Sequence, residues 1–121
     1  MNKPKKSLGQ NFLIDSNIIS KIINTVDIKN SNIIEIGPGT GNLTKKIIKK
    51  KPKQLILIEK DESLYLNLVE KYESLNIIKI HNQDILKFNL ENELKENTII
   101  FGNLPYNIAT KILTNLIKFN V

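Results

Sequence analysis

The chain is organised around one stretch of sequence, Ile33-Ile34-Glu35-Ile36-Gly37-Pro38-Gly39-Thr40-Gly41-Asn42-Leu43-Thr44. A short apolar run leads into a loop with glycine at every second position, and the residues from Lys45 onward are typical of a helix. The pattern predicts a strand, a tight turn and the start of a helix. Because glycine has no Cβ, such a turn lets the backbone approach a ligand closely.

Length and composition limit the kinds of protein to consider. The 121 residues suffice for one domain with its own core. The absence of cysteine excludes disulfides and thiolate metal sites, and His81, the single histidine, leaves little for a zinc site, so we expect no metal. No apolar run approaches the roughly 20 residues that span a bilayer, and the lysine-rich N-terminus lacks the apolar segment of a signal peptide. We therefore expect a soluble, cytoplasmic protein with no membrane partner.

Positive charge is a further compositional signal. The formal net charge is +6, and all 18 basic residues are lysines. They cluster in Lys3–Lys6 and again in Lys45–Lys53. Such clusters permit a polyanionic partner. The second cluster is equally compatible with a solvated helix face, so both interpretations stay open.

Apolar runs and helical stripes alternate along the chain. The apolar runs predict four strands, at residues 33–36, 54–59, 76–81 and 98–103. Helices are predicted after the caps Asp15 and Ser16, after the glycine loop, after the cap Asp61, and from about Ile108. The segment 86–97 is predicted to be irregular. We divide the chain into a basic arm, residues 1–14, and the first part of an α/β domain, residues 15–121.

The alternation of strands and helices predicts a parallel sheet of the α/β class. In such sheets, ligands bind beyond the carboxyl ends of the strands. Four separate segments bring Gly37, Glu59, Asp84 and Asn103 to those ends, so we expect them to form one rim. The fourth strand is apolar enough to need a neighbour beyond it. We therefore expect the chain to be the N-terminal part of a longer protein.

The spacing of the glycine loop narrows the choice of ligand. A dinucleotide loop needs G-x-G-x-x-G or G-x-G-x-x-A, but the last position falls on Asn42, and no G-K-[ST] sequence makes this a Walker A loop. Pro38 also removes a backbone N–H that a pyrophosphate could have used. The loop therefore disfavours a ligand that binds through phosphate.

Acidic residues around the loop indicate a positively charged adenosine ligand. Glu59, which follows Gly41 by 18 residues, can accept hydrogen bonds from both hydroxyls of a ribose. Asp84 can accept one from the exocyclic amine of adenine, and Glu35 adds negative potential beside the loop. Each acid taken singly is better explained as a helix cap or a loop residue, but the joint arrangement favours a ligand. S-adenosylmethionine, with its sulfonium and amino groups, fits this set.

The motif Asn103-Leu104-Pro105-Tyr106 at the end of the fourth strand suits chemistry at an adenine N6 amine. That amine is a poor nucleophile because its lone pair is delocalised into the ring. The Asn103 side-chain oxygen and the Leu104 carbonyl can accept its two hydrogens. Pro105 can fix the turn, and Tyr106 can stack on the base. The alternative is a simple turn that joins a strand to a helix.

Three ordered motifs resemble those of the small-subunit ribosomal RNA adenine N6-dimethyltransferase family (KsgA/RsmA). They are the arm motif Lys6–Leu13, the loop motif Glu35–Gly41 and the catalytic motif Asn103–Ile108. The resemblance implies a Rossmann-like class I S-adenosylmethionine-dependent methyltransferase fold. The parallel sheet would be incomplete here, with about four of seven strands, and a C-terminal helical domain would be absent.

The resemblance also implies roles for individual residues. Contacts to S-adenosylmethionine are implied at Asn11, Leu13, Gly37, Glu59, Asp84 and Asn103, and a catalytic role is implied for Asn103, Leu104, Pro105 and Tyr106. The implied reaction is dimethylation of two adjacent adenines near the 3′ end of small-subunit (16S) rRNA. The implied partner is a pre-ribosomal particle, and the implied enzyme is a monomer that acts in ribosome maturation.

Other functions remain open. The Erm enzymes methylate one adenine of large-subunit (23S) rRNA and share the arm and loop motifs, but their catalytic motif more often has isoleucine, followed by proline and phenylalanine or tyrosine. Leu104 with Tyr106 therefore favours the small-subunit enzymes. A non-catalytic RNA-binding assembly factor that retains the fold is a second alternative, against which the intact Asn103 and Tyr106 argue. A small-molecule or protein methyltransferase is a third.

Overall fold

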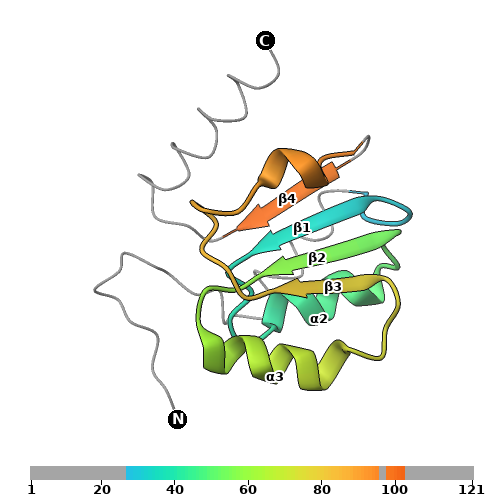
Figure 1. Cartoon of the computed structure of the whole chain (residues 1–121). Coiled ribbons are helices and arrows are strands. Elements are labelled where there is room, and N and C mark those ends of the chain that lie inside the picture. The colour runs from blue at the N-terminus through green and yellow to red at the C-terminus, as the bar shows by residue number, and fades with distance from the viewer. Residues whose placement is uncertain (1–26, 96–97, 103–121) are drawn as a thin grey trace.

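The computed structural model describes residues 27–95 and 98–102, whose elements are shown in Figure 1. In chain order these elements are β1 (Asn32–Ile36), α2 (Asn42–Lys49), β2 (Gln54–Ile58), α3 (Glu62–Tyr72), β3 (Ile78–His81), the short 3₁₀ helix η2 (Leu90–Glu93) and β4 (Thr98–Gly102). The helices predicted after Ser16 and from about Ile108 lie outside the described residues. Within those ranges, no helix has the length and apolar character needed to cross a membrane.

The four strands form one parallel sheet in the order β3-β2-β1-β4. At one edge, Ile36 of β1 pairs with Ile58 of β2 and with Gly102 of β4, and Ile58 pairs with His81 of β3. The strands therefore end together, at the side where their arrowheads lie in Figure 1. The predicted α/β fold and the predicted convergence of strand ends are confirmed for the described residues.

Two hydrophobic clusters pack against opposite faces of the sheet. The first joins residues of the strands to the helices α2 and α3 and contains Ile28, Ile33, Ile47, Leu55, Leu57, Leu68 and Phe101. The second contains Ile34, Ile36, Ile56, Ile58 and Leu90. Successive residues of β1 and β2 thus face different layers, and both layers are apolar. This double burial explains why these strands are apolar runs without alternation.

The segment between β3 and β4 is more ordered than predicted. It contains the 3₁₀ helix η2, which brings Leu90, only 5% exposed, into the second cluster. Phe88 and Leu94 pack against the same cluster. A four-residue 3₁₀ helix has no clear periodicity in sequence, so the sequence predicted an irregular segment here.

Most boundaries agree with the predicted ones to within two residues. β3 begins at Ile78, two residues later than expected, and the adjoining turn takes the preceding residues. Asp61 caps α3 as predicted, because its carboxylate accepts a hydrogen bond from the Leu64 N–H at 2.9 Å. Helix α2 has no side-chain cap and begins directly after Gly41.

Candidate functional site

The glycine loop between β1 and α2 has left-handed backbone at all three of its glycines. The φ angles are +68° at Gly37, +60° at Gly39 and +90° at Gly41, a region in which other residues are strained. A Cβ at Gly37 would meet no described atom within 4 Å. The backbone there is therefore open to a ligand, and glycine is required for its φ angle rather than for packing.

Glu59, directly after β2, binds the glycine loop through its carboxylate. One oxygen accepts a hydrogen bond from the Gly39 N–H at 2.9 Å, and the other accepts from the Asp61 N–H at 3.0 Å. The residue is 6% exposed, so the carboxylate is a fixed part of this edge. A carboxylate has about four acceptor positions, which leaves capacity for the ribose hydroxyls predicted at this site.

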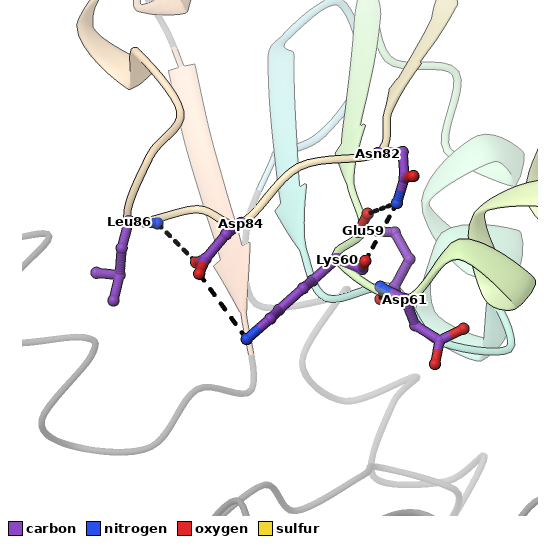
Figure 2. Close-up of polar contacts among 6 residues, drawn as sticks. All are labelled: Glu59, Lys60, Asp61, Asn82, Asp84 and Leu86. Carbon is purple, nitrogen blue, oxygen red and sulfur yellow. Dashed lines mark hydrogen bonds and ion pairs between the residues drawn. The ribbon is translucent and has the colours of Figure 1, made fainter.

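Asn82, directly after β3, is a residue of the site that sequence reasoning missed. Its side-chain amide donates to the backbone carbonyls of Glu59 at 3.0 Å and of Lys60 at 3.1 Å, as Figure 2 shows. The Glu59 N–H in turn donates to the His81 carbonyl at 2.9 Å. Asn82 thus extends the β2–β3 pairing by side-chain bonds and fixes the chain at Glu59 and Lys60. The only signal in sequence was an amide residue immediately after a strand.

Asp84 lies farther along the same loop, with both carboxylate oxygens engaged. One accepts from the Leu86 N–H at 3.0 Å, and the other lies 3.8 Å from the Lys60 ammonium (Figure 2). The Lys60 side chain is 74% exposed and that of Asp84 is 27% exposed, so this ion pair stabilises the loop only weakly. Lys60 can therefore move away from Asp84 at little cost, which would free an acceptor for an adenine amine.

Glu35 corrects an expectation about charge. Its side chain is 2% exposed and accepts a hydrogen bond from the Thr44 hydroxyl in the first turn of α2. Burial raises the pKa of Glu35 from 4.5 to about 7, the Thr44 hydrogen bond opposes this, and the charge of Glu59 adds to it. The Glu35 carboxyl is therefore only partly ionised at neutral pH, and the negative potential that we expected from it beside the loop is reduced. The carboxyl instead joins β1 to α2 beneath the loop.

Tyr72 near the end of α3 belongs to the same buried region. Burial and the nearby Glu35 both raise the pKa of its phenol. Its hydroxyl lies 3.9 Å from the position that a Cβ on Gly41 would occupy. The underside of the glycine loop is thus closed by groups that are neutral or partly neutral.

The structure brings three of the predicted site residues to one edge. Gly37, Glu59 and Asp84 follow β1, β2 and β3 respectively, three neighbouring strands. Two predicted contacts, Asn11 and Leu13, and the predicted catalytic residues Asn103, Leu104, Pro105 and Tyr106 lie outside the described residues. Among the described residues, no group of His, Asp or Glu side chains could hold a metal ion.

A parallel sheet with a glycine loop after its first strand and an acidic residue after its second is the arrangement of Rossmann-like folds, the class that includes the class I methyltransferases. Comparison with known sequences and structures narrows this class to one family. The family model described as ribosomal RNA adenine dimethylase matches residues 1–120, and the chain belongs to that family.

Individual relatives agree with this assignment. The chain is 52% identical over 115 residues to ribosomal RNA small subunit methyltransferase A of Pelagibacter ubique, a match that covers 95% of this chain and 43% of that protein. A crystal structure of a dimethyladenosine transferase from Plasmodium falciparum has a TM-score of 0.73 and 31% identity, and the match covers 89% of this chain and 38% of that one. The crystal structure of the 23S rRNA methyltransferase ErmE has a TM-score of 0.70 and 29% identity, and the match covers 86% of this chain and 41% of that one. The chain spans less than half the length of these proteins.

Proposed function

We propose that the protein transfers methyl groups from S-adenosylmethionine to the N6 amines of two adjacent adenines near the 3′ end of small-subunit (16S) rRNA. The observation that carries the proposal is the open backbone of Gly37 beside the fixed carboxylate of Glu59, in a chain of the ribosomal RNA adenine dimethylase family. The reaction would take place on a pre-ribosomal particle in the cytoplasm during ribosome maturation. We infer a monomeric enzyme with no metal.

The described residues suit the adenosine part of this cofactor. Glu59 would accept from the two ribose hydroxyls with the acceptor positions that Gly39 and Asp61 leave free. Asp84 would accept from the adenine amine after release of Lys60. The loop at Gly37 would pass close to the ligand, and Asn11 and Leu13 would complete the set. When bound, the cofactor supplies an electrophilic methyl group on a positively charged sulfur.

The catalytic motif would prepare the amine that receives the methyl group. The Asn103 side-chain oxygen and the Leu104 carbonyl would hold the two N6 hydrogens, which draws the nitrogen lone pair out of the ring and toward the methyl carbon. Pro105 would fix this turn, and Tyr106 would stack on the target base. Orientation and exclusion of water supply most of the rate increase in such a transfer. The proton leaves to water after the new C–N bond has formed.

Large-subunit methylation is the second candidate, because the ErmE structure is 29% identical and similar in fold. The 52% identity to a small-subunit enzyme favours the first. An assembly factor without catalysis would bind the particle and leave its RNA unmodified.

The test is mass spectrometry of rRNA treated with S-adenosylmethionine and the protein that carries these 121 residues. Unmethylated small subunits and unmethylated large subunits are supplied as separate substrates. We expect two neighbouring dimethyladenines near the 3′ end of the small-subunit RNA. The Asn103→Ala variant should lower turnover by at least about 100-fold while changing cofactor affinity much less. Modification of large-subunit RNA alone would favour the second candidate, and no modification of either RNA would overturn the proposed function.

A further inference from the structure

Six of the nine residues from Lys45 to Lys53 are lysines, and the proposed reaction uses none of them. They lie on α2 and on the turn that leads from it into β2. All except Lys46 are exposed, and none forms an ion pair with another residue in the described part of the chain. Helix α2 runs from the glycine loop back to the edge where the strands begin (Figure 1). This second edge therefore carries positive charge.

The fold adds two lysines from distant segments to this edge. The Asn30 N–H donates to the Lys51 carbonyl at 3.1 Å, and the Lys53 N–H donates to the Ser31 carbonyl at 2.8 Å, so the turn containing Lys29 lies beside the end of α2. The Lys95 ammonium donates to the Gln54 side chain at 3.0 Å. We define the basic edge as Lys29, Lys49, Lys50, Lys51, Lys53 and Lys95.

Within the described residues, the lysines are concentrated in one segment of the sequence. The segment 27–53 contains seven lysines and only two acidic residues, Asp27 and the buried Glu35. The neighbouring segment 59–73, which contains α3, holds five acidic residues and only two lysines, Lys60 and Lys71. The lysines of the basic edge are exposed, and the segment that carries most of them offers few carboxylates to neutralise them. A local excess of exposed positive charge is the electrostatic pattern of a polyanion-binding site.

Helix stability explains only some of these lysines. Lys46 and Lys49 lie in the last turn of α2, where positive charge compensates the helix dipole. Lys51 instead costs stability, because its φ of +57° is a left-handed conformation in which a side chain is strained. Glycine usually takes this position just after a helix. Neither the helix dipole nor the backbone conformation therefore accounts for a lysine at position 51.

We propose that the basic edge is a docking surface for the phosphates of the RNA backbone, separate from the edge that holds the methyl donor. This rests on the proposed function, since it assigns a surface to the same RNA substrate. A five-residue strand spans about 16 Å, so the docked phosphates would lie about that far from the carboxyl edge. Contacts this far from the reacting atoms are the same in the ground state and in the transition state, so they stabilise both equally. They act on the KM for RNA and leave kcat unchanged.

The test compares two variants that make the same change of charge, one within the basic edge and one outside it. The test variant is Lys50→Glu/Lys53→Glu. The control is Lys79→Glu/Lys87→Glu, whose residues are exposed; Lys79 alternates along β3 with Ile78 and Ile80, which pack on the α2 side. Lys51 is left unchanged because of its backbone conformation. Binding to in vitro transcribed small-subunit rRNA is measured by filter binding over a series of salt concentrations.

We expect the test variant to reduce the slope of log affinity against log salt by about 1.5 to 2, as loss of two phosphate contacts predicts. Its KM for RNA should rise at least about 10-fold, while kcat and S-adenosylmethionine affinity stay at the parent values. The control variant should show the same slope of log affinity against log salt as the parent protein. An unchanged slope in the test variant, or an equal change in both variants, would overturn the docking surface.

Failure of the docking surface can be told apart from failure of the proposed function. If the parent protein methylates small-subunit RNA and both variants bind RNA like the parent, the docking surface is wrong and the proposed function stands. If the parent methylates no RNA while only the test variant loses the salt-dependent binding, the docking surface stands and the proposed reaction is wrong.

Discussion

The two edges of the sheet are built by different bonds. At the carboxyl edge, side chains join the loops, because Glu59 accepts from the glycine loop and Asn82 donates to the backbone carbonyls of Glu59 and Lys60. At the edge where the strands begin, backbone bonds at Asn30 and Lys53 join the turns, and the lysines are exposed; of those in the basic edge, Lys95 alone bonds another described side chain, that of Gln54. Substitutions should therefore affect stability at the first edge and leave the fold intact at the second.

The largest effect is expected at Glu35, beneath the carboxyl edge. Because its pKa is raised from 4.5 to about 7, the folded protein binds more protons than the unfolded chain between these values. The free energy of unfolding therefore falls as the pH rises from about 4.5 to about 7 and then levels off, a change of about 3 kcal/mol from this group. Glu35→Gln cannot ionise and should remove this decline. Urea unfolding at about pH 4 and at pH 8 measures it.

The control for this experiment is Glu73→Gln, at an exposed position after α3. It should retain the decline of the parent protein. If Glu35→Gln and the parent lose the same stability between the two pH values, Glu35 is not the group responsible.

A smaller loss is expected at Asn82. The Asn82→Asp variant replaces a donor with a carboxylate that faces two carbonyl oxygens, so the free energy of unfolding should fall by about 1 to 3 kcal/mol. Asn76→Asp, at an exposed position in the turn before β3, introduces the same charge and should be nearly neutral. Urea unfolding near neutral pH compares them. Equal stability of the two variants would mean that the Asn82 bonds do not hold the carboxyl edge.

The smallest effect, of opposite sign, is expected at Lys51. Glycine adopts a φ of +57° without strain, so Lys51→Gly should raise the free energy of unfolding by about 0.5 to 1 kcal/mol. Lys53→Gly, where φ is not positive, should lower it instead. Thermal unfolding of the two variants makes the comparison. A loss of stability in Lys51→Gly would show that this lysine contributes to the fold.

Much of the fold could be predicted because it depends on local patterns. The apolar runs around Ile34 and Leu57 predicted buried parallel strands, the glycine spacing predicted the turn at Gly37, and Asp61 was predicted as a cap. Parallel topology then places the residues after each strand together without further information. That is why Gly37, Glu59 and Asp84 could be assigned to one edge.

The remaining features depend on contacts between distant parts of the chain. Burial under α2 decides the charge of Glu35, and nothing in the sequence of β1 reports that its side chain meets Thr44 rather than a ligand. The two bonds of Asn82 require the register of β3 against β2. Similarly, Lys29 and Lys95 join the basic edge only through tertiary contacts.

The central claim is that the carboxyl edge holds S-adenosylmethionine, and calorimetric titration of the Glu59→Gln variant tests it most directly. An amide at position 59 cannot accept from Gly39, Asp61 and two ribose hydroxyls together, so affinity should fall by about 1.5 to 3 kcal/mol, or roughly 10- to 150-fold. Glu73→Gln should bind like the parent protein. An unchanged affinity of Glu59→Gln for S-adenosylmethionine would contradict the account.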